Sequence, residues 1–97
     1  MSMKSPAHPG KLAKTNLEEH NLSVAEAAKT LKISRQQHHN VTQGRSAVTP
    51  RIALRYEQAF GGSADMWLRM QVSYDLAQAR KDEGNIKIPR LADQPSL

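Results

Sequence analysis

The chain has 97 residues, with 14 Lys and Arg against 9 Asp and Glu, a formal net charge of +5 and no cysteine. This length supports one domain with a modest core. The lack of cysteine excludes a disulfide framework and a thiolate metal site. No apolar run approaches the roughly 20 residues that span a bilayer, and the N-terminus lacks the apolar segment of a signal peptide. We expect a soluble cytoplasmic protein without a cofactor.

Hydrophobic spacing and helix-capping residues predict an all-α chain of five helices. The first begins at His8-Pro9-Gly10, where proline at the first helical position costs no hydrogen bond, and runs to about His20. The others are expected at about 24–31, 35–43, 50–60 and 63–81. Residues 1–97 are predicted to form one domain, with a helix-turn-helix core at about 8–62, the motif at 23–43, the C-terminal helix at about 63–81 and a tail at 82–97. Residues 1–7 and the tail are expected to be irregular.

Two short helices form the centre of this prediction. Ser23 with Glu26, and Ser34 with Gln37, both match the capping box in which side chain and backbone bond reciprocally at a helix start. Ala27, Ala28 and Leu31 give the first of these helices a small apolar stripe, while Ile33 in the turn and Val41 on the second helix face it. Two helices joined by such a tight turn are typical of a helix-turn-helix. Gly44 follows as a residue able to take a left-handed conformation.

Positive charge coincides with this motif. No acidic residue occurs between Ala27 and Tyr56. The same window contains six basic residues, namely Lys29, Lys32, Arg35, Arg45, Arg51 and Arg55. A charge run alone is often a solvated surface, but a basic block on a helix-turn-helix indicates binding to phosphate.

The last predicted helix has an unusually wide apolar surface. One face carries Trp67, Met70, Tyr74 and Ala77, and a neighbouring face carries Leu68, Val72, Leu76 and Ala79. One stripe is enough to dock a helix on its own core, so the second predicts self-association or a partner protein as an alternative to simple core burial. The expected dimer or partner interface is therefore Trp67, Leu68, Met70, Val72, Tyr74 and Leu76. In the tail, Ile86, Ile88 and Leu91 could add a short extended piece to a partner's sheet edge.

Taken in order, these motifs resemble the HigA (VapI-like) antitoxins, a branch of the XRE or Cro/C1-type (lambda-repressor-like) helix-turn-helix proteins. The resemblance covers about 8–80 and rests on HPG at 8–10, LSVAEAAKTLKISRQQ at 22–37, GRSAVTP at 44–50, IALR at 52–55, WL at 67–68 and YDLAQAR at 74–80. It implies a dimeric antitoxin that represses its own operon at a palindromic operator. It also implies neutralisation of a HigB-type toxin, a RelE-like mRNA endonuclease.

Three positions depart from the usual motif. Lys32 stands where the turn usually has Gly, which costs on the order of 1 kcal/mol without forbidding the fold. His38 replaces the usual apolar anchor of the recognition helix, and a buried His38 would need a hydrogen-bond partner and should be neutral. Val24 replaces the usual Gln at the start of the motif.

The expected DNA contacts follow from side-chain chemistry. Arg35 can pair with guanine and Gln36 with adenine in the major groove, whereas Gln37 is expected to be occupied in capping. Ser34 can offer its hydroxyl and backbone N–H to a phosphate. The complete predicted set is Ser34, Arg35, Gln36, Gln37, His39, Asn40, Arg45, Thr49 and Arg51, the last three as phosphate contacts.

Other chemistries find little support. Neighbouring histidines on a helix, such as His38 and His39, point about 100° apart, so no metal site is expected. No nucleophile–base spacing or phosphate-binding loop is present, so no catalytic residues are predicted and the chain is not expected to be an enzyme. The predicted partners are operator DNA, a HigB-like toxin and a second copy of the chain. Two alternatives stay open: a stand-alone repressor without a toxin, and a protein-binding module with a degenerate helix-turn-helix.

Overall fold

The structure is a computed structural model that describes residues 5–93. Within this range the chain forms five α-helices, α1 (Pro9–Glu19), α2 (Val24–Leu31), α3 (Arg35–Thr42), α4 (Pro50–Phe60) and α5 (Ala64–Glu83), followed by a 3-10 turn, η1 (Leu91–Asp93). The all-α prediction of five helices is confirmed. Helix α5 ends two residues later than expected, and α1 and α3 each end one residue earlier.

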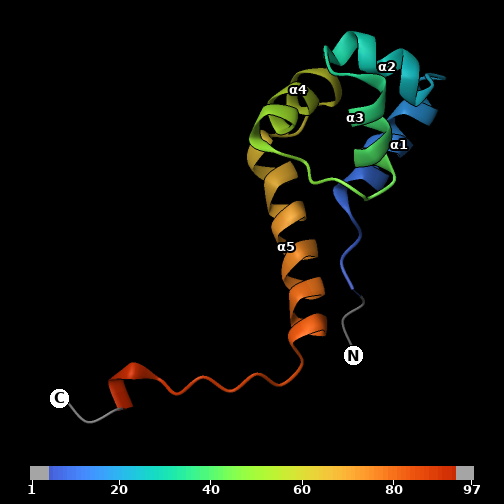
Figure 1. Ribbon diagram of the computed structural model, residues 1–97. Helices are drawn as coiled ribbons and strands as arrows, with labels where there is room; N and C mark the ends of the chain where they lie inside the picture. Colours follow the sequence, from blue (N-terminus) through green and yellow to red (C-terminus); the bar gives the residue numbers. More distant parts are fainter. Residues whose placement is uncertain (1–4, 94–97) are drawn as a thin grey trace.

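The first four helices form a body from which α5 extends (Figure 1). Residues 84–90 have no regular secondary structure, as do residues 5–7, while residues 1–4 and 94–97 of the two predicted irregular ends lie outside the described chain. Ile86, Ile88 and Leu91 in the tail are exposed and form no strand. Within residues 5–93, none of the helices combines the length and the hydrophobicity that a membrane-spanning segment requires.

The core lies where the helices of the body meet the first turns of α5. Its buried residues are Ala13, Leu17, Ala27, Ala28, Leu31, Ile33, Val41, Val48, Ile52, Ala53, Tyr56 and Trp67. Tyr56 packs between Phe60 and Trp67, with ring centroids 5.1 Å and 4.8 Å away. The predicted packing of Ile33 and Val41 against the small residues of α2 is confirmed, and the few aromatic rings fix the start of α5 on the body.

Helix α1 approaches α3 closely because Gly10 has no side chain. A Cβ at Gly10 would collide with the carbonyl oxygen of Val41 and would lie 2.8 Å from its carbonyl carbon. The Nδ1 atom of buried His8 accepts a hydrogen bond from the Gly10 N–H at 2.9 Å and so caps α1. The sequence predicted this helix start but not the capping role of His8, although a residue directly before Pro9 at the first helical position is in the right place for it.

Candidate nucleic-acid interface

The α2–α3 connection is built by local hydrogen bonds. Ser23 and Glu26 form the predicted reciprocal capping box at the start of α2. At its end Lys32 adopts the left-handed conformation, with φ 57°, and the Ile33 N–H donates to the Ala28 carbonyl at 3.1 Å. The Lys32 N–H also donates to the Lys29 carbonyl at 3.2 Å, and the two bonds give the Schellman geometry that usually has Gly at this position. Lys32 therefore takes the conformation that its place in the motif demanded.

Helix α3 is capped by Ser34, whose Oγ accepts the Gln37 N–H at 3.0 Å. The second half of the predicted capping box is absent, because within the described chain the Gln37 side chain makes no bond to the Ser34 backbone. The expectation that Gln37 is occupied in capping is therefore wrong, and its half-buried side chain is free for other contacts. Glutamine and the glutamate that closes the box at Ser23 have side chains of equal length, so reach does not explain the difference, and the single bond from the Gln37 N–H caps α3.

The outer surface of α3 is polar. Arg35, Gln36 and His39 are exposed, and Asn40 is half-buried. The Gln36 Nε2 donates to the Asn40 Oδ1 at 3.1 Å, so these two side chains form a unit one helical turn apart. Gln36 keeps one amide hydrogen and its carbonyl oxygen for a ligand. The first turn of α3 thus presents a guanidinium and amide groups to solvent.

The inner surface of α3 is held by His38, which is fully buried. Its Nδ1 lies 3.0 Å from the Val24 carbonyl oxygen and must donate to it, because a carbonyl only accepts. Desolvation lowers the pKa of His38. In the described chain its Nε2 has no hydrogen-bond partner, so a second proton there would bury an unpaired donor. The prediction that a buried His38 would need a hydrogen-bond partner is confirmed, with the Val24 backbone carbonyl as that partner. The lowered pKa favours the neutral ring that the sequence predicted.

The segment after α3 wraps around the end of the helix. Gly44 takes φ 76°, as the sequence predicted, and the Arg45 N–H donates to the Asn40 carbonyl at 2.8 Å. This turn places exposed Arg45 directly after the recognition helix. Thr49 then caps α4 through a 3.3 Å bond from the Ile52 N–H, and exposed Arg51 lies in the first turn of α4.

Gln71 of α5 holds this segment from behind, a role that the sequence analysis missed. Its Oε1 accepts the buried Val48 N–H at 2.7 Å, and its Nε2 donates to Asp75 at 2.9 Å. Gln71 is buried although it is polar. The signal was its position four residues after Trp67, which puts a polar residue on the stripe that docks α5. The backbone that carries Arg45, Thr49 and Arg51 is thus tied to α5.

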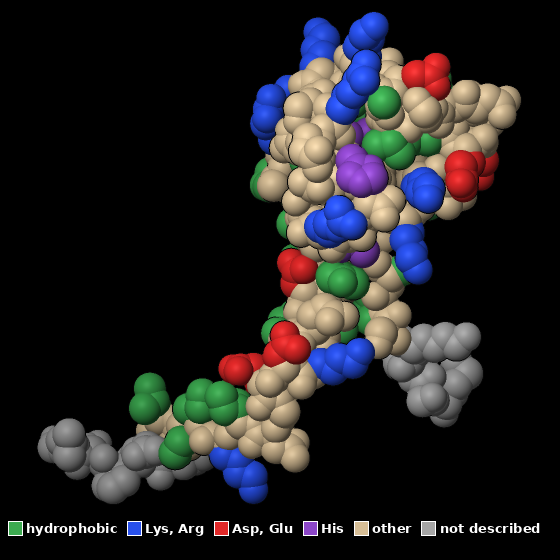
Figure 2. Space-filling view, turned by 45° about the vertical axis from the view of Figure 1, so that its right-hand side comes forward, with side chains coloured by type: hydrophobic (Ala, Val, Ile, Leu, Met, Phe, Trp, Pro, Cys, Tyr) green, Lys and Arg blue, Asp and Glu red, His purple; other side chains and the backbone are tan. Residues whose placement is uncertain are grey.

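Most of the positive charge on the surface of the body comes from the stretch between Ala27 and Tyr56, which contains no acidic residue. Figure 2 shows Lys and Arg side chains over the top and the middle of one face, around histidine side chains at its centre, with Asp and Glu towards its margins. The basic side chains of α3, the following segment and α4 are all at least partly exposed. This surface is suited to a polyanion.

Helix α5 buries only part of its apolar surface. Trp67, one of the predicted interface residues, belongs to the protein's own core. Leu68, Met70 and Tyr74 are half-buried, while Val72 and Leu76 are 55% and 46% exposed. Leu68, Val72 and Leu76 are four residues apart and so form one open stripe along the helix.

Two short helices joined by a left-handed turn, with polar side chains along the outer surface of the second, define a helix-turn-helix protein. No protein-family model matches the chain. The chain is 31% identical over 94 residues to the Escherichia coli protein YddM, an uncharacterized HTH-type transcriptional regulator, and the match covers 97% of this chain and 100% of that protein. The chain belongs to the HigA (VapI-like) antitoxin family of helix-turn-helix transcriptional regulators, which confirms the resemblance in its motifs.

Solved structures agree with this assignment. The antitoxin HigA of Pseudomonas aeruginosa, solved with the higBA promoter, matches with a TM-score of 0.81 and 29% identity over 89% of this chain and 98% of that one. The Pseudomonas aeruginosa protein PA4674, in complex with its operator DNA, matches with a TM-score of 0.77 and 30% identity over 93% of this chain and 99% of that one. Both are DNA complexes of proteins with this fold.

Proposed function

We propose that this chain is an antitoxin that binds operator DNA through α2 and α3 and so represses its own operon. The observation that carries the proposal is the first turn of α3, where Arg35 and Gln36 are exposed beside a segment rich in arginine. Similar proteins of the same fold are solved with a promoter or an operator. Arg35 reads guanine by a bidentate pair, and the Gln36–Asn40 unit reads an adjacent base.

The other predicted contacts are assigned to the DNA backbone or to neighbouring bases. The segment after α3 and the start of α4 bind phosphates through Arg45, Thr49 and Arg51. Another phosphate binds at the N-terminus of α3, where Ser34 contacts it. Gln37, free of capping, and exposed His39 contact the groove beside them.

The second part of the proposal concerns protein partners. The chain neutralises a HigB/RelE-like mRNA endonuclease toxin by binding it, and it works as a homodimer. Membership of the antitoxin family supports the toxin. The open stripe of Leu68, Val72 and Leu76 supports a protein interface on α5. A dimer would match two half-sites about one helical turn, roughly 34 Å, apart.

A gel-shift assay on the DNA upstream of the chain's own gene tests the DNA proposal. Arg35→Ala should reduce affinity for the operator by about 5- to 150-fold, the equivalent of 1–3 kcal/mol, and reduce discrimination against unrelated DNA. Arg80→Ala at the exposed end of α5 removes the same charge away from α3 and should leave binding unchanged. Unchanged affinity and selectivity in Arg35→Ala would show that α3 does not read the operator.

Co-purification with the product of the adjacent gene tests the toxin proposal. A stable complex that also shifts the promoter supports both parts. A shift by a chain that captures no toxin would identify a stand-alone repressor. A complex without any shift would identify a protein-binding module with a degenerate helix-turn-helix.

A further inference from the structure

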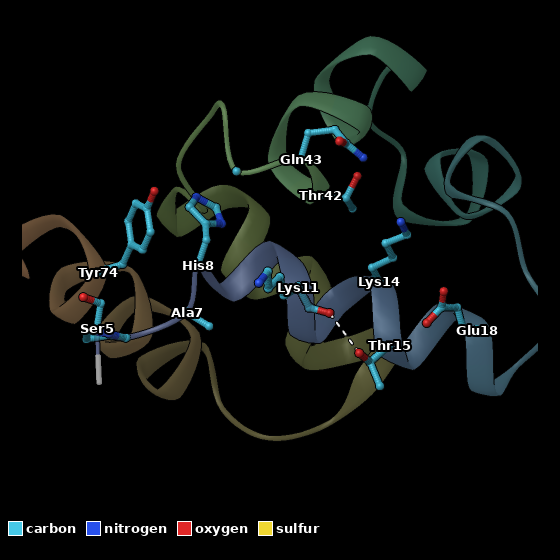
Figure 3. Close-up of a pocket in the computed structure, with 12 residues that line it drawn as sticks. Ser5, Ala7, His8, Lys11, Lys14, Thr15, Glu18, Thr42, Gln43 and Tyr74 are labelled. Carbon is cyan, nitrogen blue, oxygen red and sulfur yellow. Dashed lines mark hydrogen bonds between the residues drawn. The ribbon is translucent and has the colours of Figure 1, made fainter. Parts of the chain in front are cut away.

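An open cleft of about 690 Å³ lies between α1 and the end of α3. Lys11, Lys14 and Thr15 line it from α1, and Gln43 and Gly44 line it from the end of α3 (Figure 3). None of these α1 residues was among the predicted DNA contacts, because α1 precedes the window without acidic residues. The inference drawn from this cleft rests on the proposed operator binding.

The two lysines share one face of α1 because they are three residues apart, with Cβ atoms about 5–6 Å from each other. The opposite face is fixed in the core by Ala13 and Leu17, both almost fully buried. The contact of Gly10 with Val41 fixes the distance between α1 and α3. The lysines are therefore held beside the recognition helix by rigid elements.

Both ammonium groups are available to a ligand. Lys11 and Lys14 are exposed, and neither forms an ion pair with a carboxylate within residues 5–93. In Figure 3 the Lys14 side chain extends from α1 towards α3, on the side of Thr42. Glu18 is the one acidic residue among those that line the cleft, and it lies beyond Lys14 along the helix.

His8 also lines the cleft but is not part of its positive charge. Its Nδ1 accepts the Gly10 N–H, and its ring has a hydrogen bond to the Ser46 backbone, so both nitrogens are engaged. Desolvation lowers the pKa of His8, which favours the neutral ring. The charge that faces an anion here comes from the two lysines, while the exposed Gln43 amide adds a neutral donor.

We propose that Lys11 and Lys14 bind phosphates of the operator backbone beside the recognition helix, with Gln43 as their neutral partner. Lysine is a point charge with three donors on a flexible stem, which suits a phosphate rather than a base edge. The site extends the DNA footprint from the segment after α3 onto α1. It contributes affinity and orientation, and no sequence preference.

The experiment measures how binding of the full-length protein depends on salt, between 50 and 200 mM. The DNA upstream of its own gene is compared with unrelated DNA of equal length. Each phosphate contact contributes about −0.9 to the slope of log K against log salt. Lys11→Gln combined with Lys14→Gln should therefore make the slope less steep by about 1.8 on both DNAs. Between 50 and 200 mM salt, the affinity of the parent should therefore fall by a factor about twelve times larger than the affinity of the double variant.

The matched control is Lys81→Gln combined with Lys87→Gln, which removes two exposed charges at the end of α5 and in the tail. This control should keep the slope of log K against log salt that the parent shows. A separate variant, Glu18→Gln, should strengthen DNA binding because it removes a negative charge from the cleft. Circular dichroism checks that every variant is folded.

Two results overturn the inference and are distinguishable. If the parent binds with a salt-dependent slope and the double variant of Lys11 and Lys14 keeps that slope, only the cleft assignment fails. If the parent itself shows no salt-dependent binding to either DNA, the proposed operator binding fails and the cleft assignment fails with it.

Discussion

Replacing Gln71 by Leu tests whether α5 holds the segment after the recognition helix. The substitution removes the acceptor for the buried Val48 N–H, now 2.7 Å from Oε1. A buried donor left without a partner costs about 1–3 kcal/mol. The apolar leucine recovers part of this loss, so we expect the free energy of unfolding to fall by about 1–2 kcal/mol. For a domain of this size that loss lowers Tm by about 4–16 °C.

Two measurements follow the change in Gln71→Leu. Urea unfolding gives the stability, and amide hydrogen exchange at Val48 reports the lost hydrogen bond directly. Gln78→Leu is the matched control, since Gln78 lies on the same helix, is half-buried, and has a side chain that makes no hydrogen bond within the described chain. It should change stability by no more than about 0.5 kcal/mol. Equal stability of the two variants, with unchanged exchange at Val48, would refute this role of Gln71.

Two further predictions concern the helix-turn-helix. Lys32→Gly should stabilise the protein by about 0.5–1 kcal/mol in thermal unfolding, because Lys32 has φ 57°, whereas Lys29→Gly inside α2 should cost about 1 kcal/mol. A loss of stability in both variants would contradict the assigned turn. Because burial holds the pKa of His38 below 6.5, the unfolded chain takes up the proton first as pH falls. The contribution of His38 to the free energy of unfolding is therefore fully present above about pH 6.5, and it declines below that value by at most about 1.4 kcal/mol per pH unit. His38→Leu should remove this part of the pH dependence in urea unfolding, and an unchanged profile would exclude His38 as the titrating group.

The helix starts could be predicted because their causes are local. Ser23 and Ser34 bond to backbone groups only three residues away, and Pro50 begins α4 directly after its cap. The turn was also predictable, since the positions of Lys32 and Gly44 at helix ends demand left-handed backbone. The set of exposed residues on the first turn of α3 followed from the same periodicity. Local rules were less successful for Gln37, because a matching sequence pattern permits the second bond of a capping box without requiring it.

The sequence by itself determined the helices, the turn and the basic window, because these depend on contacts within a few residues and on composition. Only the tertiary structure decided which polar side chains are buried and what they bind. Gln71 reaches Val48 across 23 residues, and His38 reaches Val24 across 14. The tertiary structure also determines which part of the apolar surface of α5 is buried: Trp67 lies in the core, whereas the stripe that contains Val72 and Leu76 remains exposed. Such pairings depend on how helices cross, and a helix's own periodicity does not specify which part of a wide apolar face its neighbours will cover.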